Sequence, residues 1–188
     1  VHFENIKNFI KDPVLHDKDA LENLFKFGGF PDPFLQKDEL FLNLWQTTRS
    51  RQLIFEDIQT LTNIHDIYLI ELLSEIMKTQ TGQLLNRSSF AKKIKVTTQT
   101  ISRWIATLEK FYYCFSVFPW HKNIARSLIK EPKLYLWDWS LVENEGARFE
   151  NMVAVHLQKF VHFYTQIGAA KLNLYYLRDI DQKEVDFI

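Results

Sequence analysis

Three acidic residues in the last quarter of the sequence have the types and spacing to bind a divalent metal. Residues 184–188 are predicted to form a strand, and a period of two places the carboxylates of Glu184 and Asp186 on one face of it. Glu150 is predicted to lie in the first turn of a preceding helix that opens at Phe149. Oxygen ligands of this kind suit Mg²⁺. The pattern favours either a Mg²⁺ site at Glu150, Glu184 and Asp186 or a hairpin whose outer face is simply charged.

A second group of residues has the chemistry of a nucleic-acid interface. Residues 86–109 predict a helix–turn–helix, whose second helix buries an apolar face spaced i, i+3, i+4, i+7 from Ile101. Its other face carries short polar and basic side chains near the N-terminal end, as a recognition helix does. The candidate nucleic-acid-binding residues of the two helices are Lys92, Lys93, Thr98, Gln99, Ser102 and Arg103.

The residues that follow predict a wing. Aromatic and β-branched residues favour strands at 112–118 and 133–137, and the long loop between them is basic, with Lys122 and Arg126 as further nucleic-acid contacts. A helix–turn–helix followed by a two-stranded hairpin with a basic tip is typical of a winged helix. Winged helices also serve as protein–protein modules, so DNA contact and a purely structural role both stay open.

The distribution of charge supports the nucleic-acid reading. The whole chain is neutral, with 23 basic and 23 acidic residues. Residues 86–133 nevertheless hold 10 basic and 2 acidic side chains, a net charge of +8, whereas the segments on either side are net acidic. Such a block is a candidate footprint for phosphates. The alternative is a basic face that meets acidic segments of its own chain.

Length and composition limit the class of protein. A chain of 188 residues with 46% hydrophobic residues fits one large or two small globular domains. With one cysteine it forms no intrachain disulfide, and it lacks both a signal-peptide pattern and an apolar run long enough to span a bilayer. We therefore expect a soluble, cytoplasmic protein without a membrane partner. No phosphate-cradling P-loop occurs, so no ATP site is expected in this chain.

The order of the remaining elements is also readable. Helices are predicted over 4–26 with a break at Pro13, over 38–51, over 52–59 and over 65–78. Two glycines and two prolines within 28–33 predict a turn between the first two. An apolar strand is predicted at 172–177.

Several short motifs, taken together in this order, resemble one family. They are Gly28-Gly29-Phe30-Pro31, a helix with Trp45, Phe55-Glu56-Asp57-Ile58, the helix–turn–helix, Pro132-Lys133-Leu134-Tyr135-Leu136-Trp137-Asp138, Phe149-Glu150-Asn151-Met152-Val153, and Tyr175-Tyr176-Leu177-Arg178 leading to Glu184-Val185-Asp186-Phe187. The pattern resembles the C-terminal region, of unknown function, of the prokaryotic AAA-type ATPases. The resemblance covers about residue 20 to the end.

The resemblance implies an α+β fold, mostly helical, in which a winged helix-turn-helix is followed by a truncated α/β domain similar to PD-(D/E)xK restriction endonucleases. It divides the chain into ATPase lid-like helices at 1–48, a winged helix domain at 49–140 and half of the endonuclease-like domain at 141–188. ATP and Mg²⁺ would bind a preceding ATPase domain that this chain lacks. The endonuclease-like pattern would continue with a strand carrying an acid and a lysine. Without them, we expect no lysine beside the acids, at most weak Mg²⁺ binding and no enzyme activity in this chain.

The function that these patterns favour is a nucleic-acid-binding and regulatory module of an AAA-type ATPase. Its partners would be DNA and its own ATPase domain or other subunits. One alternative is a protein-interaction scaffold that does not bind DNA. Another is a metal-dependent nuclease domain within a longer parent chain.

Overall fold

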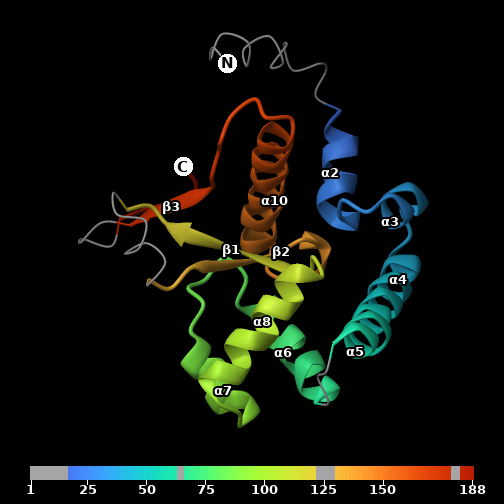
Figure 1. Cartoon of the computed structure of the whole chain (residues 1–188). Helices are drawn as coiled ribbons and strands as arrows, with labels where there is room; N and C mark the ends of the chain where they lie inside the picture. Colours follow the sequence, from blue (N-terminus) through green and yellow to red (C-terminus); the bar gives the residue numbers. More distant parts are fainter. Residues whose placement is uncertain (1–16, 63–65, 122–129, 179–182) are drawn as a thin grey trace.

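The computed structural model describes residues 17–62, 66–121, 130–178 and 183–188, which form a mixed α+β fold (Figure 1). A small sheet lies at its centre with the strand order β2-β1-β3-β4. Strand β1 (Cys114–Pro119) pairs antiparallel with β2 (Lys133–Leu136) and parallel with β3 (Tyr175–Arg178). Strand β3 pairs antiparallel with β4 (Glu184–Val185). The hairpins predicted before and after residue 140 are thus joined in one sheet.

Helices cover both faces of the β1–β2 hairpin, and the side chains alternate between two cores. Cys114, Leu134 and Leu136 belong to the larger core, together with residues of the helices between 67 and 110. Phe115 and Tyr135, which point the opposite way, belong to the second core with residues of the long helix that follows the sheet. This double burial explains why all four residues of β2 are buried, as in sheets that are packed on both faces.

The larger core is built by α6 (Ile67–Thr79), α7 (Arg87–Ile94) and α8 (Thr98–Lys110), together with buried residues of the segment 52–58. Asn86 caps α7 by accepting a hydrogen bond from the backbone N–H of Ser89, and Thr97 caps α8 in the same way through that of Thr100. Between the helices the chain turns at Lys95, whose φ is 63°. The predicted pair of helices over 86–109 is confirmed to within one residue at each end.

Residues 82–85, between α6 and α7, add a short stretch of pairing beside β2. The backbone N–H of Gly82 donates to the carbonyl of Leu134 at 2.8 Å, and that of Leu85 donates to the carbonyl of Pro132 at 2.8 Å. A β-bridge joins Leu84 to Lys133. The α7–α8 pair is therefore tied to the sheet on both sides, through residues 82–85 and through β1.

The N-terminal helices run along the side of the molecule (Figure 1). They are α2 (Lys18–Phe27), α3 (Pro31–Gln36), α4 (Glu39–Arg51), a π-helical segment η1 (Gln52–Ile58) and α5 (Gln59–Leu61). The predicted turn is confined to residues 28–30, because Pro31 already begins α3. Gly29 is required there, since a Cβ atom would lie 2.5 Å from Cη2 of Trp139. The helix predicted before Pro13 lies outside the described residues.

Helix α10 (Glu145–Gln166) covers the second face of the hairpin. It begins four residues earlier than predicted, because Asn144 caps it by accepting from the backbone N–H of Ala147 at 2.9 Å. The buried amide of Asn151 hydrogen-bonds both the N–H and the carbonyl of Leu136, which fixes the helix on β2. The turn before it, η2 (Trp139–Leu141), packs on α2. None of the described helices is long and apolar enough to cross a membrane.

Candidate functional site

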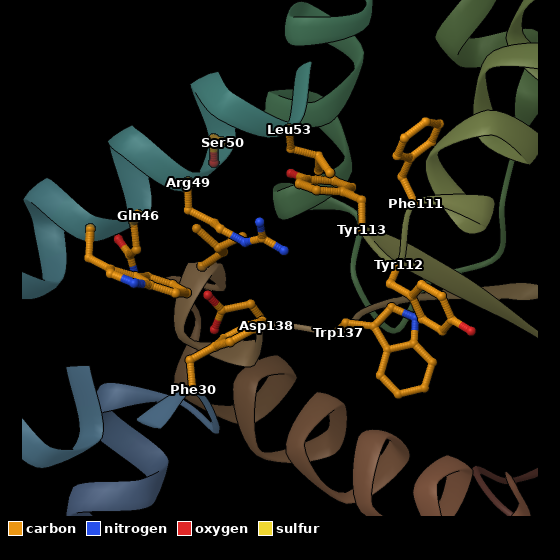
Figure 2. A pocket seen from close by; sticks show the side chains of 12 residues that line it. Phe30, Gln46, Arg49, Ser50, Leu53, Phe111, Tyr112, Tyr113, Trp137 and Asp138 are labelled. Atoms are coloured by element: carbon orange, nitrogen blue, oxygen red, sulfur yellow. The ribbon is translucent and has the colours of Figure 1, made fainter. Parts of the chain in front are cut away.

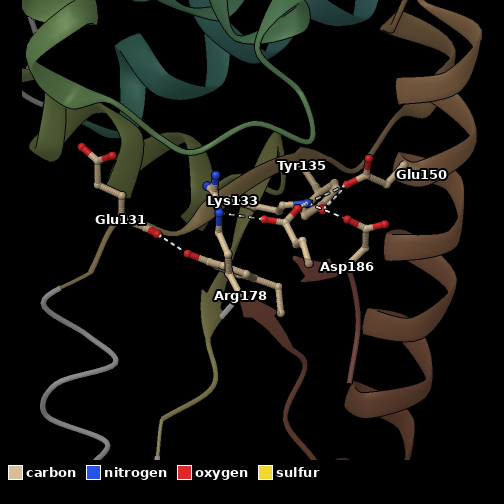
Figure 3. A network of polar contacts seen from close by, with 8 residues as sticks. Glu131, Lys133, Tyr135, Glu150, Arg178 and Asp186 are labelled. Carbon is tan, nitrogen blue, oxygen red and sulfur yellow. Dashed lines mark hydrogen bonds and ion pairs between the residues drawn. The ribbon is translucent and has the colours of Figure 1, made fainter. Parts of the chain in front are cut away.

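The Nζ atom of Lys133 lies among three carboxylates (Figure 3). It is 2.5 Å from Oε1 of Glu184, 2.7 Å from Oδ1 of Asp186 and 3.3 Å from Oε1 of Glu150. The lysine comes from β2, Glu150 from α10, and the other two acids from β4 and the residue after it. We call these four residues the Lys133 cluster. The strand predicted over 184–188 is limited to Glu184 and Val185, with Asp186 directly after it, and both acids reach Lys133, as Glu150 does.

The sheet forces this arrangement on Lys133. Its side chain is only 5% exposed, and an ammonium group removed from water needs opposite charges nearby. Gly82 provides part of the space for them, since a Cβ at this position would lie 3.2 Å from both carboxylate oxygens of Glu150. The carboxylates themselves remain partly open to solvent: side-chain exposure is 27% for Glu150, 25% for Glu184 and 50% for Asp186.

Tyr135 lies beside the Lys133 cluster, on the same face of β2 as Lys133. Its hydroxyl donates to Oε1 of Glu150 at 2.6 Å, and its ring packs against the rings of Phe115 and Phe187. Burial raises the pKa of Tyr135 above its ordinary value, and the hydrogen bond to Glu150 raises it further. The tyrosine is therefore a permanent hydrogen-bond donor to Glu150 at physiological pH.

The charges around Lys133 decide its protonation. Burial by itself would lower the pKa of this lysine, but the hydrogen bonds to Asp186 and Glu184 and the charge of Glu150 outweigh burial. The net result is a pKa above the ordinary value, so Lys133 is held as a cation. One cation among three acids leaves the Lys133 cluster with a formal excess of negative charge when all three are ionised, and Arg178 lies 3.8 Å from Glu184 at its edge.

One expectation about the acids is wrong. They were expected to gather without a lysine, but Lys133 lies between them and joins all three. Among the residues that the structure describes, no group of three or more His, Cys, Asp or Glu side chains is arranged to hold a metal ion. Mg²⁺ binding at Glu150, Glu184 and Asp186 thus stays a prediction, and any metal there would have to compete with an ammonium group for the same oxygens.

The second predicted site is an exposed face of α7 and α8. Lys92 and Lys93 on α7 are exposed, and so are Thr98, Gln99 and Arg103 on α8. The opposite face of α8 is fully buried in the larger core. Within the described part of the chain, no ion pair or hydrogen bond engages the charged groups of Lys92, Lys93 or Arg103. We call these five residues and Ser102 the α7–α8 face.

The remaining predicted nucleic-acid contacts divide into two cases. Ser102 is half-buried, and its hydroxyl donates to the carbonyl of Thr98 at 3.0 Å, which leaves the hydroxyl oxygen free to accept. Lys122 and Arg126 lie outside the described residues. The structure therefore brings six of the eight predicted contacts onto two adjoining helices.

Sequence reasoning missed Lys133 and Tyr135 as members of a site, although both carried a signal. Residues 134–137 form an apolar strand, and a lysine beside such a strand will be desolvated and needs an anionic partner. The period of two places Tyr135 on the same face as Lys133. Glu184 and Asp186, which are also two residues apart in a predicted strand, were candidates for this anionic partner.

A protein-family model described as "Domain of unknown function (DUF8612)" matches residues 18–146. The match includes the α7–α8 face, Lys133 and Tyr135, whereas Glu150, Glu184 and Asp186 follow it in the chain. No significant match was found among curated proteins or among solved structures.

Proposed function

This chain belongs to the DUF8612 family, and we propose that it works as a nucleic-acid-binding module that contacts duplex DNA through the α7–α8 face. The observation that carries the proposal is the positive charge of that face, which has no ion-pair partner among the described residues. Lys92, Lys93 and Arg103 are exposed beside the hydrogen-bonding side chains of Thr98 and Gln99, so phosphate and base-edge contacts are available on one surface.

The order of the elements supports a winged helix as the carrier of this face. Helix α6, the paired residues 82–85, helices α7 and α8, and the hairpin β1–β2 follow one another in the order that such a domain requires. In that arrangement the exposed face of α8 enters the major groove. Such a domain carries its wing between β1 and β2, where Lys122 and Arg126 lie outside the described residues.

Duplex binding is tested by fluorescence anisotropy over a range of salt concentrations. Each phosphate contact contributes a slope of about −0.9 in a plot of log K against log salt. Replacing Lys92, Lys93 and Arg103 together by alanine should weaken binding and flatten the slope by about 0.9 for each contact that is lost. A matched control removes three exposed charges elsewhere: Lys18, Arg51 and Lys171 to alanine. Equal affinity and slope in the two triple variants would contradict the proposal.

The larger setting that we propose is an AAA-type ATPase, of which this chain would be the C-terminal regulatory part. The support is the resemblance of the sequence motifs to that family. The module would couple ATP turnover in the ATPase domain to contact with DNA. If the salt-dependent binding is missing, the same fold is better explained as a scaffold that packs on its own ATPase domain or on another subunit.

The Lys133 cluster favours a second candidate, a metal-dependent nuclease in a longer parent chain. Carboxylates that hold Mg²⁺ and a lysine that positions the attacking water are the groups that phosphodiester hydrolysis uses. In this chain Lys133 engages all three acids, so we expect at most weak Mg²⁺ binding and no cleavage. Supercoiled plasmid incubated with Mg²⁺ or Mn²⁺ tests this, beside an Asp186→Ala control. Nicking that disappears in the control would make this chain itself the enzyme.

A further inference from the structure

A groove separates the N-terminal helices from α10, on a different surface from the α7–α8 face. Its volume is about 820 Å³. One wall comes from α2, α4 and the turn between α2 and α3, and the other comes from one face of α10 and the residues around Trp137. A narrower hollow of about 30 Å³ continues from it toward Asp138 (Figure 2). Both are lined by Phe30, Arg49, Tyr112 and Trp137.

The groove is lined by aromatic rings and by positive charge. Besides the three rings shared with the inner hollow, Trp139 and Phe163 contribute to its walls. Arg49 and Lys159 stand on opposite walls, and no acidic side chain lines the groove itself. Neither charged group forms an ion pair or a hydrogen bond within the described part of the chain. The guanidinium of Arg49 lies 5.9 Å from the centre of the Phe30 ring.

An acceptor lies at the end of the inner hollow. Asp138 is only 8% exposed, and its Oδ1 accepts hydrogen bonds from the backbone N–H and the hydroxyl of Ser140. Its Oδ2 has no hydrogen-bond donor among the described residues. The hollow is large enough for a water molecule or for one small donor such as an amino group. Because the carboxylate of Asp138 lines this hollow, it disfavours an incoming carboxylate and favours an N–H donor.

We propose that this groove binds unpaired nucleotides of single-stranded nucleic acid. The bases stack on the exposed rings of Tyr112 and Phe163. Arg49 and Lys159 contact phosphates, and one base places its amino group near Asp138. Aromatic platforms in a positively charged groove are the combination that single strands require. An acidic peptide could pair with the two cations, but its carboxylates would be repelled by Asp138. Acidic side chains also do not stack on aromatic rings as bases do.

Single-strand binding in the groove is a different activity from the duplex contact proposed for the α7–α8 face, and the two can be tested separately. Fluorescein-labelled oligo(dC) and oligo(dT) of about 12 nucleotides serve as probes in anisotropy titrations with the whole chain. The double variant Arg49→Ala, Lys159→Ala should bind oligo(dC) about tenfold or more weakly, and its salt slope should be flatter by about 0.7 per lost contact. The control is Arg51→Ala, Lys171→Ala, which removes two exposed charges outside the groove and should bind as the unchanged chain does.

The base preference tests Asp138 directly. Cytosine carries an amino group where thymine has a carbonyl oxygen, so oligo(dC) should bind about fivefold more tightly than oligo(dT). In Asp138→Asn the oxygen that faces Ser140 can be kept while an amide N–H₂ replaces Oδ2, and the preference should disappear or reverse. Circular dichroism and thermal melting establish that each variant is folded, and the Arg49–Lys159 result stands independently of the asparagine variant.

The inference would be overturned if neither oligonucleotide bound, or if the groove variant and its control bound equally well. It would also be overturned if free dCMP bound as tightly as oligo(dC), or if a poly-glutamate peptide displaced the oligonucleotide from the groove. The Lys92, Lys93, Arg103 triple-alanine variant separates the two proposals. It should lose duplex binding and keep the groove-dependent binding of oligo(dC). Loss of oligo(dC) binding in that variant, with the groove variant unaffected, would place the strand on the α7–α8 face instead.

Discussion

The cations of the α7–α8 face and Lys133 all belong to the most basic part of the chain, residues 86–133, but their positive charges have opposite roles. On the face, Lys92, Lys93 and Arg103 are exposed and unpaired within the described residues. In the cluster, Lys133 is 5% exposed and contacts three acids. An exposed cation adds little to folding and remains available to an outside anion, whereas a buried cation is stable only together with its acids.

The net charge of a sequence segment differs from the net charge of the surface that this segment forms. Residues 86–133 carry a net charge of +8, yet Lys133 is neutralised inside the molecule by residues from 150 to 186. For this residue the structure bears out the alternative that basic groups meet acidic segments of their own chain. The charge available to bind an outside anion is better estimated from exposed, unpaired side chains than from the net charge of a sequence segment.

The largest effect is expected when Lys133 is replaced by methionine. This change leaves three carboxylates facing one another around an apolar side chain, and the free energy of unfolding should fall by about 3 kcal/mol. Urea denaturation followed by tryptophan fluorescence measures it. Lys92→Met is the matched control on the α7–α8 face and should change stability by no more than about 0.5 kcal/mol. Equal losses in the two variants would remove the distinction between the two regions.

Tyr135→Phe should have the next largest effect. It deletes the hydroxyl that donates to Glu150 at 2.6 Å and leaves the buried ring in place. A hydrogen bond to a charged group contributes about 1.5 kcal/mol, and the free energy of unfolding should fall by that amount. Tyr112→Phe, at a residue that is 68% exposed, should leave stability unchanged. A neutral result at Tyr135 would show that Lys133 alone satisfies Glu150.

The cluster also predicts how stability depends on alkaline pH. The folded chain raises the pKa of Lys133 above its ordinary value of 10.5, so it holds the proton more tightly than the unfolded chain does. This contribution is complete below about pH 10.5 and is lost as the pH rises through the folded pKa. The stability difference between the unchanged chain and Lys133→Met should therefore be constant from about pH 7 to about pH 9, and above about pH 10.5 it should shrink by at most about 1.4 kcal/mol per pH unit. A difference that grows with pH would contradict the ion-pair explanation.

The smallest effect on stability is expected for substitutions on the α7–α8 face. Replacing Lys92, Lys93 and Arg103 together by alanine should change the free energy of unfolding by no more than about 0.5 kcal/mol, because these side chains are exposed and unpaired within the described residues. Thermal and urea denaturation of the same triple variant that is used for DNA binding would measure it. A loss of several kcal/mol would mean that the face is structural.

Local chemistry accounts for what the sequence predicted well. The apolar spacing from Ile101 depends on neighbours within a few residues, and the structure confirms that this face of α8 is buried. Glu150, Glu184 and Asp186 were predicted as one candidate metal site, and all three contact Lys133. Only the pairing of β1 with β3 explains why they meet Lys133 as well.

What could not be predicted depends on contacts between distant segments. Lys133 and Asp186 are 53 residues apart, and no local pattern pairs their strands. The groove likewise combines Arg49, Trp137 and Lys159 from three separate parts of the chain. The π-helical form of residues 52–58 shares its apolar spacing with an ordinary helix, so the sequence predicted a helix there without its type.

The parallel pairing of β1 with β3 also determines when the sheet is completed during synthesis. Pro119 pairs with Tyr176, which the ribosome adds 57 residues later. At roughly 5–20 residues per second, β1 exists for about 3–11 s before its neighbour has been made. During that interval one edge of the hairpin offers unpaired N–H and carbonyl groups to any other strand nearby. Nascent chains on the same polysome are therefore most open to pairing with one another in those seconds, and a chaperone that shields the edge would act at that point in synthesis.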